Sequence, residues 1–268
     1  MDLRSAFGFH TTPFTREIKT DQLFVLPMLQ QALDGTLRAV DRRMSAAVIA
    51  PAGTGKTTVA RALKDRLPEA RYRVRYVKGI SLSKRDTCRE IARACGIDPV
   101  GSFPTIICKL QERFERTLDD DGLRPVLILD DAHDLRPDVL AMLRTLTNFA
   151  MDSRLVLSIV LVGQSPLAAL LARDDQEAIA RRIAHYASLR PLSRDETQDY
   201  LAHRTSIAGA RQHPFDAAAT DALFEMSRGN LRAIDGLALE SLDLAAAAKL
   251  QVVSAQHVAA ARKALWPS

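Results

Sequence analysis

The segment Ala50–Thr57 has the residue types and spacing of a loop that binds nucleotide phosphates. It reads Ala-Pro-Ala-Gly-Thr-Gly-Lys-Thr and lies between a short apolar run and the start of a helical pattern, which is the order that such a loop requires. Gly53 and Gly55 permit backbone angles that turn successive N–H groups toward phosphate oxygens. We expect Lys56 to reach the β- and γ-phosphates and the Thr57 hydroxyl to hold Mg²⁺. ATP and Mg²⁺ are therefore the expected cofactors, bound by Gly53, Thr54, Gly55, Lys56, Thr57 and Thr58.

Two carboxylates form the second candidate motif. Asp130 and Asp131 end the apolar run 125–129, and a buried parallel strand would place both at its carboxyl end, where open α/β sheets carry their chemistry. Asp130 is expected to hold Mg²⁺, and Asp131 to orient and polarise the attacking water. The second position is commonly Glu, which is one methylene longer, and the usual loop opens with Gly where this chain has Ala50. We therefore expect nucleotide binding with slow hydrolysis.

Three further positions carry polar side chains suited to phosphoryl transfer. Gln164 follows the apolar run 155–162 and is expected to touch the γ-phosphate or the catalytic water. Arg181 and Arg182 end a helical segment, and such sites commonly take an arginine from a neighbouring subunit. Arg232 opens a later helix and is expected to point back at the nucleotide. For each position the alternative is an ordinary surface or strand-end residue.

Basic residues are concentrated between positions 71 and 93. Eight Lys and Arg occur in this window together with only Asp86 and Glu90. Residues 71–78 alternate like a strand with one basic face, and Ser81 or Ser83 can cap a helix after it. Because phosphate backbones are bound by Lys and Arg without base-reading geometry, we expect sequence-independent binding of double-stranded DNA. The candidate residues are Arg73, Arg75, Lys78, Lys84, Arg85 and Arg89; a solvated charged face is the alternative.

Composition and apolar periodicity predict an α/β fold, a parallel sheet with helices on both faces, followed by a small all-α lid. The 268 residues are 47% hydrophobic with a net charge of +5, and the boundaries we expect are 1–190 for the nucleotide-binding domain and 191–268 for a lid of four helices. A helix follows Leu26, with an interruption expected at Asp34-Gly35. No apolar run is long enough to cross a membrane, so a cytoplasmic protein is expected.

The N-terminal stretch Phe7–Phe14 holds three aromatics and a proline and is predicted to form a cap rather than a free tail. One interpretation is an arm that covers an apolar surface. The other is that it closes over the adenine of the nucleotide. Cys88, Cys95 and Cys108 form no C-x-x-C pair and are expected to be thiols without a metal or disulfide role.

The order of these motifs resembles that of AAA+ ATPases over nearly the whole chain. Within them, five segments resemble the bacterial ExeA group, which is similar to the MuB- and TnsC-type ATPases of transposons: Phe7–Phe14, Asp131–His133, Leu161–Leu167, Leu189–Ser193 and Gly229–Arg232. The resemblance implies Lys56 and Thr57 as Walker A residues, Asp130 and Asp131 as Walker B, Gln164 as sensor 1, Arg182 as arginine finger and Arg232 as sensor 2.

The resemblance implies an ATP-dependent regulator of transposition. Such a protein oligomerises on duplex DNA when ATP is bound, as a ring or a helical filament. It recruits a transposase, and a target-selection protein is a further expected partner. ATP hydrolysis releases it. Secretion-type members carry a membrane segment after the ATPase, and this sequence ends at Ser268, so we expect the regulator, with no membrane contact. The alternatives are an ExeA-type secretion or envelope-assembly ATPase acting on proteins, and a switch that binds ATP but scarcely hydrolyses it.

Overall fold

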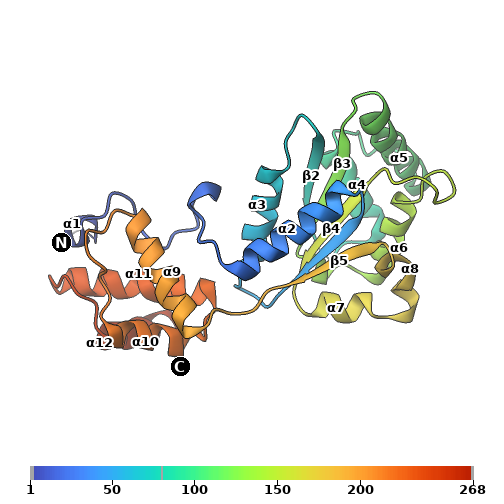
Figure 1. Cartoon of the computed structure of the whole chain (residues 1–268). Coiled ribbons are helices and arrows are strands. Elements are labelled where there is room, and N and C mark those ends of the chain that lie inside the picture. Colours follow the sequence, from blue (N-terminus) through green and yellow to red (C-terminus); the bar gives the residue numbers. More distant parts are fainter. Residues whose placement is uncertain (1–2, 80, 267–268) are drawn as a thin grey trace. The chain divides into compact units, whose positions relative to one another are not determined.

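Figure 1 shows a computed structural model of the chain, which describes residues 3–79 and 81–266. The chain divides into two compact units. Unit 1 consists of Met1–Leu26, Ala52–Thr54 and Arg190–Ser268, and unit 2 of Pro27–Pro51 and Gly55–Leu189. In the described part of the chain, no helix combines the length and apolar character needed to cross a membrane.

Unit 2 is built on a five-stranded sheet in the order β2-β3-β4-β1-β5. All four strand pairs are parallel. The central strands are almost continuously apolar, as expected where both faces of a parallel sheet are covered. The expected α/β fold is therefore confirmed. The strands are β1 (Ser45–Ile49), β2 (Tyr72–Lys78), β3 (Arg124–Asp130), β4 (Ser158–Gly163) and β5 (Ile183–Ser188).

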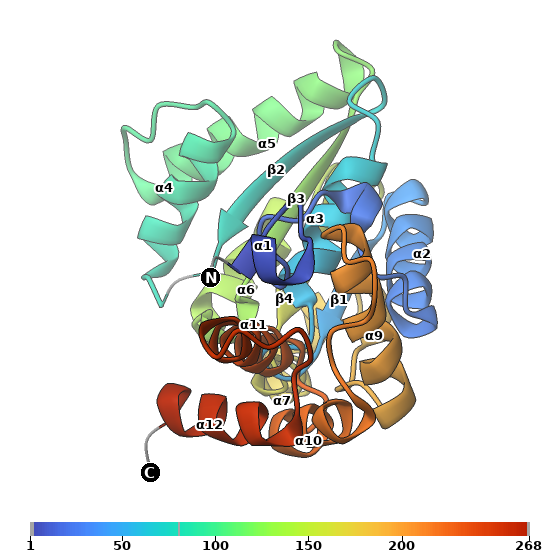
Figure 2. The same cartoon turned by 90° about the vertical axis from the view of Figure 1, so that its left-hand side faces the viewer.

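Helices cover both faces of this sheet. One face is covered by α2 (Pro27–Asp41) and α3 (Lys56–Arg66), and the other by α4 (Lys84–Ala94), α5 (Phe103–Asp119) and α6 (Pro137–Leu146). Figure 2 shows α4 and α5 on one side of β2 and β3, and α2 on the other. Shorter elements complete the unit: η2 (Ala132–Asp134), α7 (Pro166–Leu171), η3 (Asp174–Gln176) and α8 (Glu177–Ala180).

Side-chain alternation along β3 decides which face each residue serves. Leu127 and Leu129 belong to the main apolar core under α4, α5 and α6. Val126 and Ile128 point to the opposite face, where α3 lies. Asp130 follows Ile128 by two residues and so points to that face as well. The last residue of β3 is therefore directed to the face that carries the helix after the phosphate loop.

The expected interruption of α2 at Asp34-Gly35 is wrong, because the helix runs unbroken from Pro27 to Asp41. Glycine weakens a helix interior by about 1 kcal/mol relative to alanine, so its presence needs a packing reason. A Cβ on Gly35 would lie 2.2 Å from Nε2 of His185 in β5. The glycine thus makes room for an imidazole and does not mark a break.

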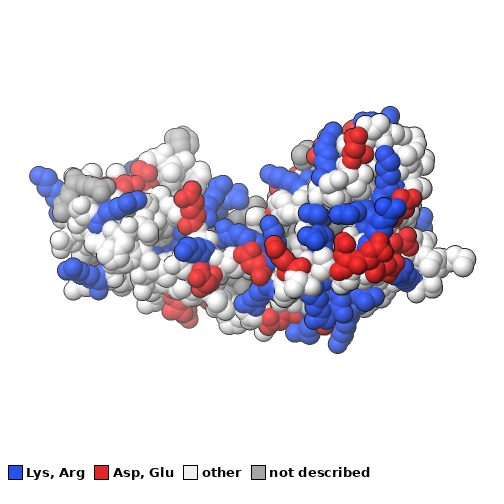
Figure 3. Space-filling view, turned by 90° about the horizontal axis from the view of Figure 1, so that it is seen from above, with Lys and Arg blue, Asp and Glu red and all other residues white. Residues whose placement is uncertain are grey.

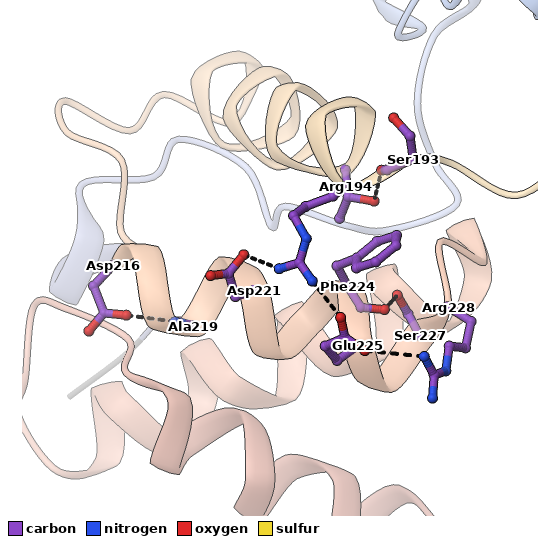
Figure 4. A network of polar contacts seen from close by, with 10 residues as sticks. Ser193, Arg194, Asp216, Ala219, Asp221, Phe224, Glu225, Ser227 and Arg228 are labelled. Carbon is purple, nitrogen blue, oxygen red and sulfur yellow. Dashed lines mark hydrogen bonds and ion pairs between the residues drawn. The ribbon is translucent and has the colours of Figure 1, made fainter.

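Unit 1 contains the four C-terminal helices expected from the sequence. They are α9 (Arg194–Ile207), α10 (Ala217–Ser227), α11 (Leu231–Ala247) and α12 (Ala255–Leu265), joined by α1 (Leu3–Phe7) and η1 (Thr20–Gln22). Arg194, in the first turn of α9, forms ion pairs with Asp221 and Glu225 of α10 and lies 4.9 Å over the Phe224 ring (Figure 4). This network ties α9 to α10.

The N-terminal arm packs on the C-terminal helices within unit 1. Phe9 and Phe14 are 5% and 3% exposed, and the Phe14 ring meets the Phe215 ring edge-on at 6.0 Å. The His10 N–H donates to the Ala208 carbonyl at 2.7 Å. These contacts support the interpretation of an arm that covers an apolar surface; contact with adenine stays a prediction.

A buried polar network joins the arm to α9 and α11. Arg204, 6% exposed, donates to Tyr200 Oη and to the Thr15 carbonyl, each at 2.8 Å. Tyr200 Oη in turn donates to Asp235 Oδ1 at 2.7 Å. Burial raises the pKa of Asp235 to about 6, although the charges of Arg204 and Arg16 oppose the rise.

This raised pKa makes the stability of unit 1 depend on pH. Since the folded-state pKa of Asp235 exceeds the unfolded value, its contribution is fully present below about pH 4 and is lost as pH rises through about 6. Asp235→Asn, which keeps an acceptor for Tyr200, is expected to gain on the order of 1–3 kcal/mol relative to wild type between pH 4 and pH 7. Urea unfolding of both proteins across this range measures the difference. A difference that does not change with pH would contradict the assignment.

Candidate nucleotide-hydrolysis site

The phosphate loop leads from β1 into α3. Gly55 caps α3 with φ of 97°, a left-handed conformation that glycine adopts without strain. Lys56 begins the helix, is 7% exposed, and donates from Nζ to the carbonyls of Ala50 (3.1 Å) and Pro51 (2.7 Å). The N–H groups of the first helical turn and the helix dipole favour an anion at this helix start. Ala50 is buried at the end of β1 and is not among the described residues with positive φ, so its Cβ is tolerated in place of the usual glycine.

The middle of the loop, Ala52–Thr54, belongs to unit 1. There Asn230 Nδ2 donates to the Ala52 carbonyl at 2.6 Å, and the Arg232 N–H donates to the Gly53 carbonyl at 3.2 Å. Gly53 has φ of 75°, and a Cβ on it would lie 2.3 Å from Asn230 Oδ1. Asn230 also caps α11 by accepting from the Ala233 N–H. The sequence marked Arg232 but gave no reason to assign Asn230 a contact with the loop.

Thr57 and Asp130 meet as oxygen donors suited to Mg²⁺. Thr57 Oγ1 donates to Asp130 Oδ2 at 3.2 Å, and Asp130 is 3% exposed. Protein sites for Mg²⁺ commonly offer one or two such oxygens and leave the remaining positions to water and phosphate. Among the described residues no cluster of three or more His, Cys, Asp or Glu could hold a metal ion. The donor set therefore fits Mg²⁺ carried with a nucleotide, with Thr57 and Asp130 as its protein oxygens.

Tyr76 is a neighbour of this carboxylate that the sequence did not reveal. Its hydroxyl donates to Asp130 Oδ2 at 3.0 Å. Burial and the negative charge of Asp130 raise the pKa of Tyr76 to about 12, so the phenol stays protonated and remains a donor. Tyr76 pairs in register with Ile128 of β3, and side chains alternate between the two faces of a strand. Tyr76 therefore points to the same face of the sheet as Asp130, two residues after Ile128.

Asp131 follows in a left-handed turn, with φ of 54° and ψ of 33°. A short polar side chain tolerates this conformation better than most residues. Its N–H donates to Asp130 Oδ1 at 2.9 Å, and its Oδ2 lies 3.5 Å from Lys78 Nζ. The candidate water-polarising carboxylate is thus paired with a lysine from the end of β2.

Gln164 lies just past β4, which pairs with both β3 and β1. Parallel strands bring their carboxyl ends to one edge, so the phosphate loop, the two aspartates and Gln164 share that edge. The Gln164 amide nitrogen is 2.6 Å from His133 Nε2. His133 follows the aspartates closely in sequence but was not assigned a role there.

Arg182 lies at the opposite edge of the same sheet, immediately before β5. Its guanidinium forms an ion pair with Asp152 at 2.7 Å, while Arg181 pairs with Glu177 at 2.6 Å. The side chain of Arg182 is 23% exposed and that of Arg181 is 76% exposed. Both arginines line a cavity of about 460 Å³. A β-strand rises about 3.3 Å per residue, so the length of the sheet separates Arg182 from the edge at which Asp130 and Gln164 lie.

The basic window divides between two faces of the sheet. Arg73 and Arg75 lie on the same face of β2 as Val77, which belongs to the core under α4 to α6. Lys78 has the parity of Tyr76 and lies beside Asp131. Ser83, not Ser81, caps α4 by accepting from the Asp86 N–H. Lys84 and Arg85 begin this helix.

Several cations of the window already have partners. Arg71 pairs with Asp41, Arg89 with Asp86 and Arg93 with Glu90. Within residues 3–79 and 81–266, the members without an ion-pair partner are Arg73, Arg75, Lys84 and Arg85. On the part of Figure 3 that draws unit 2, at the right, Lys and Arg are interspersed with Asp and Glu. The positive surface is therefore smaller than the sequence count indicates.

The three cysteines carry no recognisable chemistry. Cys88 and Cys95 are buried and Cys108 is exposed, all as free thiols. Burial raises the pKa of Cys88 and of Cys95 to about 11, so both remain protonated and unreactive near neutral pH.

A curated relative agrees with the resemblance to the ExeA group. The chain is 32% identical over 185 residues to the general secretion pathway protein A of Aeromonas hydrophila, a match that covers 68% of this chain and 34% of that protein. The chain thus spans about a third of the length of the curated relative it matches.

Solved structures share the fold. Cdc6p from Pyrobaculum aerophilum matches with a TM-score of 0.77 and 21% identity, over 100% of this chain and 72% of that one. The Aeropyrum pernix ORC1 protein, solved in complex with DNA, matches with a TM-score of 0.69 and 20% identity, over 91% of this chain and 67% of that one. The model of the family described as AAA domain matches residues 39–171, a range that holds the phosphate loop and both aspartates. The fold is therefore that of an AAA P-loop domain, and residues 39–171 are similar to the AAA domain family.

Proposed function

We propose that the protein is a Mg²⁺-dependent ATPase of low turnover that assembles on duplex DNA in its ATP-bound form and regulates transposition. The observation that carries the ATPase part is the meeting of the Thr57 hydroxyl with the buried Asp130 carboxylate, 3.2 Å apart, beside the start of α3. Bound there, the Mg²⁺ nucleotide would supply an electrophilic γ-phosphorus. The chain's own residues hold the phosphates at Lys56 and accept a proton from water at Asp131.

The place of Arg182 supports assembly into a homo-oligomer. Its position at the amino-terminal edge of the sheet supports an action on the nucleotide of a neighbouring copy. Each site is then completed by a second subunit, and bound ATP favours the homo-oligomer. ATP hydrolysis weakens this contact and releases the assembly.

The proposal of DNA binding rests on Arg73, Arg75, Lys84 and Arg85, the cations of the basic window that have no ion-pair partner among the described residues. Fold neighbours from Aeropyrum pernix and Drosophila are described as bound to DNA, which supports a nucleic-acid partner. Contacts of this kind are to phosphates, so binding should depend steeply on salt and little on sequence.

Replacing Arg73, Arg75 and Lys84 together by Glu is expected to weaken binding to a fluorescent duplex by about 10-fold or more, since each replacement removes a phosphate contact. Fluorescence anisotropy, with a non-hydrolysable ATP analogue and with no nucleotide, measures the affinity. Nucleotide binding should be unchanged. Lys64, Arg211 and Lys249 are exposed, and their triple replacement by Glu is the control with the same change in charge.

Two outcomes would reject the DNA proposal. One is wild-type protein that shows no ATP-stimulated duplex binding at low salt. The other is equal loss of binding in the triple variant and its control, which would show a non-specific charge effect.

A second candidate function is a secretion or envelope-assembly ATPase acting on protein partners. The observation that favours it is the 32% identity to general secretion pathway protein A. Undiminished duplex binding in the triple variant would favour this candidate. The neighbouring genes provide a separate test, because an adjacent transposase gene supports transposition and adjacent secretion genes support this alternative.

A further inference from the structure

The turn after the two aspartates lies directly against the end of β4. A Cβ on Gly163 would be 3.0 Å from the His133 backbone nitrogen and 2.8 Å from Leu167 Cδ2. Such distances leave no room for a side chain, so the glycine is what allows η2 to approach this strand. The approach places His133 next to Gln164, two residues that are 31 positions apart in sequence.

The contact between these two side chains is short and partly buried. The Gln164 amide nitrogen lies 2.6 Å from His133 Nε2, and the His133 side chain is 11% exposed. An amide nitrogen only donates, so the imidazole nitrogen accepts. Within the described part of the chain, Nδ1 of His133 has no hydrogen-bond partner. Asp134 is the neighbouring charge, with Oδ1 3.9 Å from Nε2, beyond hydrogen-bond distance.

Both partners are anchored to the hydrolysis site. Only Ala132 separates His133 from Asp131, and the turn is closed by the Asp134 N–H, which donates to the Asp131 carbonyl at 3.0 Å. Gln164 follows the strand that pairs with β3. A free glutamine side chain loses rotamer entropy when it is fixed, and a hydrogen bond to a fixed ring offsets part of that cost before substrate binds.

We propose that His133 is a positioning residue for ATP hydrolysis, which holds the Gln164 side chain by its amide nitrogen. The amide oxygen then remains as the acceptor for a proton of the attacking water. This inference rests on the proposed ATPase function and concerns the same site. It assigns His133 no contact with the nucleotide or the reacting atoms.

The test compares His133→Leu with His133→Gln. Leu removes the acceptor and should lower kcat by about 10-fold or more, since a small misplacement of a positioning group costs up to about 100-fold. KM for ATP should stay within about twofold, because no ground-state contact is lost. Gln offers a polar atom near the Nε2 position and should restore kcat to within about threefold of wild type. Asp134→Asn, which changes the adjacent charge, should leave kcat unchanged.

A double-variant cycle separates positioning from a general structural effect. If His133 acts through Gln164, His133→Leu combined with Gln164→Leu should be no slower than Gln164→Leu alone. Additive losses would overturn the inference. So would a His133→Gln variant as slow as His133→Leu, or a raised KM with unchanged kcat.

A spectroscopic measurement does not depend on turnover. The side-chain amide signals of Gln164 in a ¹H–¹⁵N spectrum should shift in His133→Leu and return toward wild type in His133→Gln. Unmoved signals would overturn the inference. Wild-type protein that hydrolyses no ATP would instead overturn the proposed function, while these signals still decide whether His133 holds Gln164.

Discussion

Lys56→Met is expected to lower kcat for ATP hydrolysis at least about 100-fold, the loss typical when one preorganised charge aimed at the transition state is removed. The side chain is buried at the start of α3 and donates to two loop carbonyls. We expect its charge to lie beside the terminal phosphates of a bound nucleotide. Steady-state phosphate release measures the effect.

The same replacement also removes two hydrogen bonds within the loop. Each is worth about 1 kcal/mol net, so the free energy of unfolding should fall by about 1–2 kcal/mol. Assays well below the unfolding transition keep this loss separate from the catalytic one. Lys64→Met is the matched control, because Lys64 belongs to the same helix but is exposed. Equal rates of phosphate release by wild type and Lys56→Met would show that Lys56 takes no part in ATP hydrolysis.

Two replacements of Asp131 are expected to change the hydrolysis rate in opposite directions. Asp131→Asn removes the carboxylate that we propose polarises water, and it should lower kcat by about 100-fold, the usual scale for a general base. Asp131→Glu extends the same carboxylate by one methylene and should raise kcat several-fold, since reach is what the shorter side chain lacks. Single-turnover measurements with saturating Mg²⁺ and ATP separate these effects from nucleotide binding.

The backbone at Asp131 limits the gain from Glu. Its φ of 54° favours short polar residues, so Glu should lower the free energy of unfolding by roughly 1 kcal/mol. Asp134→Asn, in the same turn, serves again as the control. Equal rates for wild type and Asp131→Asn would exclude Asp131 from catalysis and favour a switch that binds ATP with little hydrolysis.

Local signals sufficed for the phosphate loop and the strand ends. The pattern Gly-Thr-Gly-Lys-Thr is specific to one loop conformation. A buried strand that is followed by two acidic residues places those residues at its carboxyl end. Chain order therefore predicted that Thr57 and Asp130 serve one ion, and the structure brings them to 3.2 Å. The roles of these residues in hydrolysis stay predictions.

Non-local pairing accounts for what the sequence did not reveal. β5 was not predicted, because Ile183–Ser188 is an edge strand with weak alternation, in which Ala184, Tyr186 and Ser188 are exposed. The contacts of Asp130 with Tyr76 depend on the pairing of β2 with β3. A local sequence pattern does not predict which strands pair. Lys78 was grouped with Arg73 and Arg75 by proximity in sequence, although its odd spacing from them puts it on the other face, beside Asp131.

The position of Arg182 before β5 bears on the geometry of the proposed ring or filament. There an arginine at one edge of the sheet would serve the nucleotide at the other edge of the next copy, which is a head-to-tail contact. An open row of n copies then has n − 1 completed sites, whereas a closed ring has n. The rate of ATP hydrolysis per subunit should therefore rise with the length of a filament and then level off. In a ring, this rate should reach its full value when the ring closes.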